Sequence, residues 1–246
     1  MRAIPMSSAD RHRGRHPLDE ELFGPASTPA LRQAVADLSW LLGRGYARNS
    51  AVKLVGDRYE LRERQRLATA RAACSDTARE ARSQNHIPAE ILHGRTVWID
   101  GFNLLVTLEA ALSGGVLLHC RDGCLRDMSS VHGSYHTVVE TDTAITLVGN
   151  RLAELHAASV HWLLDKPVSN SGRLAARIRE LAEQHAWPWT VEPVFNPDTD
   201  LIAARDAITI SSDAVVIDGA ASWYNLASDL ILTHRCGPAW VVDLRE

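Results

Sequence analysis

The residues TVWIDGFNLL (Thr96–Leu105) carry the clearest indication of fold in this chain. The run begins with a short apolar segment rich in β-branched and aromatic residues, which is typical of a strand buried on both faces. Gly101 then allows a sharp turn, and Asn103 is suited to capping a following helix. Asp100 is therefore expected to end a buried parallel strand, where open α/β sheets bind their ligands. An ordinary turn-forming aspartate is the alternative.

Two further expected strands, Ser159–Asp165 and Ala207–Asp213, also end in aspartate. Right-handed crossovers bring the carboxyl ends of successive parallel strands to one edge of a sheet. We therefore expect Asp100, Asp165 and Asp213 to lie together. Clustered carboxylates repel one another unless a cation or a proton is present, so three independent turn formers are a weaker explanation than one site.

The composition is that of an ordinary water-soluble globular protein. The chain has 246 residues, of which 46% are apolar and 23% are charged, enough for one large domain or for a small and a medium one. No apolar run approaches the roughly 18 residues that a membrane span needs. The start of the chain has no hydrophobic signal core. The four cysteines follow no regular disulfide framework. These features predict reduced thiols, a cytoplasmic location and no membrane partner.

The net charge of −4 conceals an uneven distribution. Residues 44–82 hold ten Lys and Arg against five Asp and Glu, a net of +5. Residues 91–246 hold eleven against nineteen, a net of −8. A basic part joined to an acidic part is consistent with a nucleic-acid-binding surface beside a metal site. It equally fits two halves that attract each other.

Three segments are expected along the chain. Residues 1–26 lack a hydrophobic period and are expected to form a flexible tail. Residues 27–90 predict a basic helical module that resembles a helix-turn-helix, and residues 91–246 predict an α/β domain. Glu60 and Glu63 are interleaved with the arginines of the third expected helix, about 61–82, so pairing along that helix is an alternative to nucleic-acid binding. The arginines that are candidates for nucleic-acid binding are Arg62, Arg64 and Arg66.

Several motifs resemble known families. Asp100-Gly101-Phe102-Asn103 resembles the opening motif of PIN and NYN-type ribonuclease domains, and Ser211-Ser212-Asp213 resembles the end of the PIN site. The stretches Trp40–Tyr46 and Leu54–Tyr59 are similar to the N-terminal part of a prokaryotic two-part family whose C-terminal part is PIN-like. That similarity extends over nearly the whole chain after residue 27. After Asp213 the chain departs from the PIN pattern, which leaves Asp218 as an alternative to Asp213.

The resemblance implies a PIN-like, Rossmann-like α/β fold, in which a mostly parallel sheet with flanking helices follows the small all-α module. In PIN and NYN-type domains an aspartate that ends the first strand holds a divalent metal and a polar residue follows it, which implies these roles for Asp100 and Asn103. A second acid lies on a helix, for which Glu140 and Asp142 are the candidates, although an acid there also favours the helix dipole. NYN-type domains carry a further aspartate before the fourth strand, and the candidates for it are Asp198 and Asp200. A helix cap explains either residue equally well.

Two polar segments are expected to face the substrate. Residues 119–136 form a long charged passage, in which Arg121, Arg126 and His132 are candidates for phosphate contact and proton exchange. Cys120 and Cys124 in the same passage match no standard zinc spacing. The turn after the strand that ends at residue 165 places small polar residues at a helix N-terminus, which can bind a phosphate or merely cap the helix. Its candidate residues are Ser169, Asn170, Ser171 and Arg173.

The leading hypothesis is therefore a metal-dependent ribonuclease. Asp100, Asp165 and Asp213, with Glu140 or Asp142, would bind Mg²⁺ or Mn²⁺ and activate a water for in-line attack on an RNA phosphodiester. The expected partner is RNA, tRNA and other structured RNAs included, and a homodimer is one option for the assembly. Two alternatives stay open. One is a non-catalytic RNA-binding or regulatory protein of the same shape, and the other is a phosphoryl-transfer enzyme acting on a small phosphorylated molecule.

Overall fold

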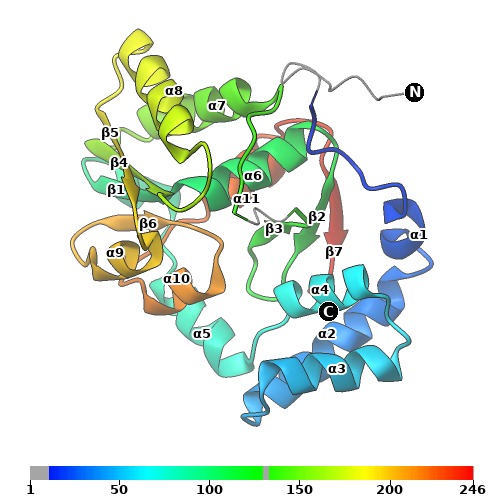
Figure 1. Ribbon diagram of the computed structural model, residues 1–246. Coiled ribbons are helices and arrows are strands. Elements are labelled where there is room, and N and C mark those ends of the chain that lie inside the picture. Colours follow the sequence, from blue (N-terminus) through cyan, green and yellow to red (C-terminus); the bar gives the residue numbers. More distant parts are fainter. Residues whose placement is uncertain (1–10, 130–132, 246) are drawn as a thin grey trace, which may run out of the picture.

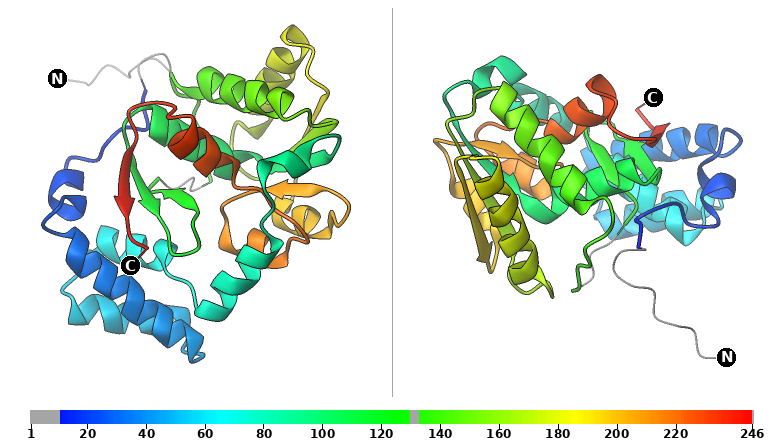
Figure 2. Two further views of the ribbon diagram at one scale, coloured as in Figure 1. Left: turned by 180° about the vertical axis from the view of Figure 1, so that it is seen from behind. Right: turned by 90° about the horizontal axis from the view of Figure 1, so that it is seen from above.

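The computed structural model describes residues 11–129 and 133–245, whose strands form two sheets with helices between and around them (Figures 1 and 2). Sheet A holds β1 (Thr96–Asp100), β4 (Ser159–Asp165), β5 (Trp189–Val194) and β6 (Ile208–Ile210). Sheet B holds β2 (Val116–His119), β3 (Leu125–Asp127) and β7 (Trp240–Asp243). None of the described helices has the length and apolar character that crossing a membrane requires.

Sheet A is parallel throughout, in the order β5-β4-β1-β6. The chain moves outward from β1 to β4 and β5, and then returns to place β6 on the other side of β1. This reversal makes a topological switch point between the carboxyl ends of β1 and β6, where open α/β sheets bind ligands. The expected α/β fold with a mostly parallel sheet and a helical N-terminal part is confirmed.

Helices cover both faces of sheet A because its strands are apolar on both faces. Trp162 and Leu164 of β4 lie in the large core with α6 (Gly101–Leu112) and α8 (Ser171–Gln184), whereas Leu163 packs with α9 (Pro197–Ala203) and α10 (Ala214–Gly219). This alternation is the period of two that a strand imposes. The remaining helices of this part are α7 (Thr141–Glu154), which packs on α6 and α8, and α11 (Leu226–Ser228), which continues into a π-helical turn at Asp229–Thr233.

Sheet B joins the helical module to the rest of the molecule. Leu117 of β2 lies in the core around α6, whereas its neighbours Val116 and Leu118 lie in a second core with the helical module. The sheet is therefore buried on both faces, and the boundary expected at residue 90 divides two regions that share a core. The helices before β1 are α1 (Asp19–Phe23), α2 (Thr28–Gly43), α3 (Arg48–Arg58), α4 (Glu63–Ala72), α5 (Asp76–Asn85) and a 3₁₀ turn at Ala89–Leu92.

The sequence predicted that residues 1–26 form a flexible tail. Residues 11–26 instead contact the rest of the protein, and residues 1–10 lie outside the described part. Arg13 pairs with the buried carboxylate of Glu109 in α6, and α1 buries Leu22 and Phe23. Individual polar and apolar side chains, rather than a regular apolar face, attach this segment. It therefore has no hydrophobic period that a sequence pattern could reveal.

The helix expected over residues 61–82 is in fact two helices, α4 and α5. Ser75 lies between them in an extended conformation, and its Oγ accepts a hydrogen bond from the backbone N–H of Ala78 at 3.1 Å. A serine that satisfies an otherwise unpaired N–H group at a helix start favours a new helix at this point. After the break, α5 packs against both α2 of the helical module and α10.

We expect the substitution Gly149→Ala to lower the free energy of unfolding by about 1–3 kcal/mol, the usual cost of overpacking. A Cβ at Gly149 in α7 would lie 2.1 Å from the ring of Trp187. That ring is stacked between His185 and Trp189, so it cannot swing aside freely. Urea unfolding measures the change. The control is Gly172→Ala in α8, where an added Cβ meets no atom within 4 Å, and equal losses in both variants would contradict this account.

Candidate functional site

Asp100 is the central side chain at the switch point of sheet A. It ends β1 and caps α6, with its Oδ1 accepting from the backbone N–H of Asn103 at 3.4 Å. Its Oδ2 accepts from the Oγ of Ser211, which follows β6, at 2.8 Å. The carboxyl group is only 6% exposed. Burial, with smaller contributions from the charges of Asp198 and Asp213, raises the pKa of Asp100 to about 7 against the opposing effect of the hydrogen bond from Ser211.

Asn103 fastens the end of β6 to the start of α6. Its Oδ1 accepts from the backbone N–H of Ser212 at 2.8 Å and from the Ser212 Oγ at 2.9 Å. The expected role of orienting a ligand is therefore left to the amide nitrogen, because the oxygen already has partners. Ser211 and Ser212 are the residues that position both polar groups at the end of β1.

The alternative between Asp213 and Asp218 is resolved by their partners. Asp213 caps α10, with its Oδ1 accepting from the backbone N–H of Val215 at 2.8 Å, and its charge acts on Asp100. Asp218 lies a turn further along α10 and forms an ion pair with Arg82. Asp213 is thus the acid that belongs to the switch point.

Two more carboxylates belong to this edge of the sheet. Burial raises the pKa of Asp165, at the end of β4. Burial also raises the pKa of Asp198, in the first turn of α9, and the charges of Asp213 and Asp165 add to that increase. The structure therefore brings Asp100, Asp165 and Asp213 to one edge and adds Asp198, which was one of two alternatives in the sequence. Within the described residues, no three His, Cys, Asp or Glu side chains are arranged as a ready-made metal site.

One of these acids, Asp213, lines a cavity of about 680 Å³ between the helical module and the switch point. One wall is formed by Asn103 and the residues Ser212–Val215, and the other by Leu67, Arg71 and the first residue of α3, Arg48. The guanidinium of Arg48 donates to the backbone carbonyl of Ala70 at 2.7 Å, and it forms no ion pair with any described residue. The cavity therefore places the guanidinium of Arg48 in the wall opposite Asp213.

Glu140 and Asp142 are not brought to the switch point. Glu140 contacts His12 at the N-terminal end of α7. Asp142 receives two hydrogen bonds from Arg177 of α8, at 3.0 Å to Oδ1 and 2.5 Å to Oδ2. The assignment of a metal-binding acid to either residue is therefore withdrawn, because both carboxylates pair with side chains of other segments.

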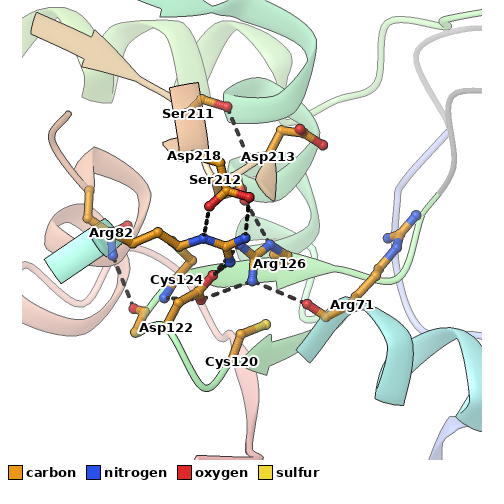
Figure 3. A network of polar contacts seen from close by, with 12 residues as sticks. Arg71, Arg82, Cys120, Asp122, Cys124, Arg126, Ser211, Ser212, Asp213 and Asp218 are labelled. Carbon is orange, nitrogen blue, oxygen red and sulfur yellow. Dashed lines mark hydrogen bonds and ion pairs between the residues drawn. The ribbon is translucent and has the colours of Figure 1, made fainter. Parts of the chain in front are cut away.

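Arg126 is a buried structural residue rather than a free phosphate ligand. Its guanidinium donates to both carboxylate oxygens of Asp122, at 3.0 and 2.7 Å, and to the backbone carbonyl of Ser212 at 2.7 Å (Figure 3). Arg82 of α5 reaches the same Asp122 from the other side and also binds Asp218. Burial alone would raise the pKa of Asp122, but the two guanidinium groups outweigh it and lower the pKa. Arg126 thus positions the segment that follows β6.

The other proposed phosphate contacts are dispersed. Arg121 pairs with Asp76 of α5 at 2.8 Å. In the turn after β4, the backbone N–H of Ser169 donates to Gly133 and that of Ser171 donates to Val168, so these groups are occupied. Asn170 has a left-handed φ of 70° and donates to the carbonyl of Tyr135. Arg173 is exposed, and His132 lies outside the described residues.

The three arginines predicted to bind nucleic acid line a groove along α4, but each is paired with an acid of the helical part. Arg62 binds Glu21, Arg64 binds the buried Asp19, and Arg66 binds Asp57. Arg64 and Arg66 are partly buried in these pairs, whereas Arg62 remains exposed, and nucleic-acid binding by the three stays a prediction. Arg48 was missed, although its place at the start of a helix, where a positive charge opposes the helix dipole, is a signal that could have identified it.

Two family comparisons match the chain. Residues 89–229 match the family described as "Domain of unknown function (DUF5616)", and residues 30–84 match "Protein of unknown function (DUF434)". The uncharacterized protein MJ0935 of Methanocaldococcus jannaschii is 32% identical over 191 residues, which cover 76% of this chain and 91% of that protein. No solved structure matches the chain. The expected membership of a two-part family is confirmed, whereas the PIN-like identity of its C-terminal part stays a prediction.

We expect the ionisation of Asp100 to make the protein less stable as pH rises. The folded carboxyl group keeps its proton up to about pH 7, whereas an unfolded aspartate loses it near pH 4, roughly. The folded state therefore binds more protons between these values, and stability falls through this window and levels off above it. Urea unfolding at several pH values should show that the difference in unfolding free energy between wild type and Asp100→Asn falls from about pH 4 to about pH 7. A difference that does not vary with pH would contradict the buried-carboxyl account.

The pairing of Arg64 predicts a structural effect of its removal. The Nε of Arg64 lies 2.8 Å from Oδ1 of Asp19, whose side chain is 1% exposed. Arg64→Ala would leave that carboxylate buried without its cation, and we expect a loss of roughly 2–3 kcal/mol in unfolding free energy. Arg62→Ala, which breaks only the exposed pair with Glu21, should change stability by no more than about 0.5 kcal/mol. Thermal or urea unfolding measures the loss of stability in each variant. Similar losses in Arg64→Ala and Arg62→Ala would contradict a buried structural role for Arg64.

Proposed function

The chain belongs to the family described as a domain of unknown function, DUF5616, and we propose that it is a divalent-metal-dependent ribonuclease. The observation that carries the proposal is the gathering of Asp100, Asp165, Asp198 and Asp213 at this edge of the sheet, where neighbouring carboxylates add to the raised pKa of Asp100 and of Asp198. A cluster of acids that is costly in the absence of a cation is the arrangement expected of a cation-binding site. It lies at the edge where open α/β sheets bind ligands.

The donor set fits a hard cation. Carboxylate oxygens are the ligands that Mg²⁺ and Mn²⁺ prefer, and none of the four acids is neutralised by an ion pair with a described basic side chain. Asp100, Asp198 and Asp213 would hold the ion. When bound, such an ion lowers the pKa of a water molecule and stabilises charge on a phosphodiester.

The protein groups around the acids would bind and orient the substrate. The uncompensated guanidinium of Arg48 lies in the wall of the neighbouring cavity, where a phosphate could accept its hydrogen bonds. The amide nitrogen of Asn103 lies at the same cavity. The helical module therefore contributes to substrate binding through Arg48 rather than through the three paired arginines of α4.

The phosphoryl-transfer alternative receives less support. It relied on free backbone N–H groups in the turn at residues 169–173, and those of Ser169 and Ser171 are already donated to backbone carbonyls. A non-catalytic RNA-binding protein of the same shape is the outcome to be separated by experiment. The observation in favour of this non-catalytic alternative is that the described residues contain no preformed group of three metal ligands.

The test is cleavage of a short 5′-labelled RNA by metal-stripped protein with and without Mn²⁺. We expect cleavage only with the ion, and a loss of at least about 100-fold in Asp100→Asn, because removing an ionised ligand costs several kcal/mol of transition-state stabilisation. The matched control is Asp206→Asn. Asp206 is an exposed acid two residues before β6, at the opposite end of that strand from Asp213.

Circular dichroism and thermal unfolding establish that Asp100→Asn is folded. RNA cleavage that needs no divalent ion, or that survives in Asp100→Asn at the level of Asp206→Asn, refutes the hydrolytic site. RNA binding without cleavage in the wild-type chain supports the non-catalytic alternative.

A further inference from the structure

Phe195 is exposed to solvent at the same edge of sheet A. Its side chain is 75% exposed, more than any other large apolar side chain that the structure describes. It follows β5 directly and precedes α9, so it lies where the carboxyl ends of the strands meet. Single exposed apolar residues are common on protein surfaces. The position of this one beside the acids gives it functional interest.

The ring of Phe195 lies beside a cation from the neighbouring turn. The ammonium nitrogen of Lys166 lies 4.7 Å from the ring centroid. The backbone N–H of Lys166 donates to the carbonyl of Val194 at 2.7 Å, which ties the turn after β4 to the turn after β5. Asn196 then caps α9. An aromatic ring and a cation are therefore presented together from two adjoining turns.

The pair adjoins two of the four acids. Lys166 follows Asp165 in the chain, and Phe195 precedes Asp198 by three residues. On the other side of the switch point lies the cavity with Arg48. Figure 1 shows α9 and α10 next to each other, with α4 further along on the side of the helical module. Asp213, which caps α10, lines the cavity that contains Arg48.

An aromatic ring beside a cation suits one class of ligand. Every nucleobase has a π-face that can stack on an aromatic side chain, and the adjoining phosphate can contact a lysine. A base inside a duplex is stacked on its neighbours and cannot do so. We propose that Phe195 and Lys166 bind an unpaired nucleotide, so that a single-stranded RNA crosses the carboxylates from Phe195 towards the cavity at Arg48. This inference rests on the proposed ribonuclease function and names the form of its substrate.

The chain provides a matched comparison in Trp40. Trp40 of α2 is 57% exposed, and the guanidinium carbon of Arg44 lies 4.2 Å from its ring centroid. It borders a separate groove with Leu41 and the exposed Leu54, in the helical module. Trp40 thus reproduces the exposed ring and its cation away from the acids of the switch point. The acid in its own groove, Asp37, is paired with Arg58.

The experiment measures binding of fluorescein-labelled RNA by anisotropy, with Mn²⁺ present and Asp100→Asn as the parent so that the RNA stays intact. The probes are a single strand of about ten nucleotides, within the range of known site sizes, and a blunt duplex of the same length. Phe195→Leu keeps the apolar bulk and removes the π-face. We expect it to weaken single-strand binding by about tenfold, whereas Phe195→Trp and Trp40→Leu should stay within about twofold of the parent.

An affinity of Phe195→Leu within about twofold of the parent overturns the proposal, and so does a loss of the same size in Trp40→Leu or a parent that prefers the duplex. The outcome is independent of catalysis. Loss of affinity in Phe195→Leu with no cleavage by the wild-type chain refutes the ribonuclease and leaves the nucleotide site. Metal-dependent cleavage with unchanged affinity in Phe195→Leu refutes the nucleotide site and leaves the ribonuclease.

Discussion

The buried charge of Arg126 holds the parts of this protein in register. Its side chain is 10% exposed, and a charge so far removed from water is tolerated only when it is paired and hydrogen-bonded. Asp122 supplies the countercharge from the same hairpin, and the remaining contacts are backbone carbonyls of Arg71 in α4 and Ser212 after β6. One guanidinium therefore fixes sheet B, the helical module and the switch point relative to one another. Because Ser212 in turn holds Asn103, the geometry at the end of β1 depends on this pair.

The buried acid at the carboxyl ends of the strands of sheet A lowers local stability. A carboxyl group as buried as Asp100 is stabilised by its serine and backbone hydrogen bonds, yet burial still raises its pKa to about 7. Packing alone would favour an apolar or neutral side chain there, since buried ionisable groups lower stability unless they are compensated. Residues that conflict with local stability are expected mainly at functional sites. The same argument applies to Phe195, whose exposed ring contributes little to the core.

The sequence was sufficient for sheet A and its acids because both depend on short-range signals. Buried parallel strands appear as apolar runs, and the order of strands and helices limits the topology to few choices. Asp100, Asp165 and Asp213 were therefore predictable. The partners of charged side chains were not, because they lie far away in the chain: Arg64 binds Asp19, 45 residues before it. A charge pattern along one helix cannot distinguish an outward-facing arginine from one paired in three dimensions.

The division into a basic and an acidic part also takes a different meaning in three dimensions. The helical module covers one face of sheet B, and Val116 and Leu118 would be exposed without it. Its arginines mostly compensate acids of its own segment or of neighbouring turns, so the net charge of the module overstates what a ligand could contact. At the cavity, Arg48 donates to a backbone carbonyl and forms no ion pair with a described carboxylate. Both halves therefore line this cavity: the segment after β6 contributes Asp213, and the module contributes the opposite wall with Arg48.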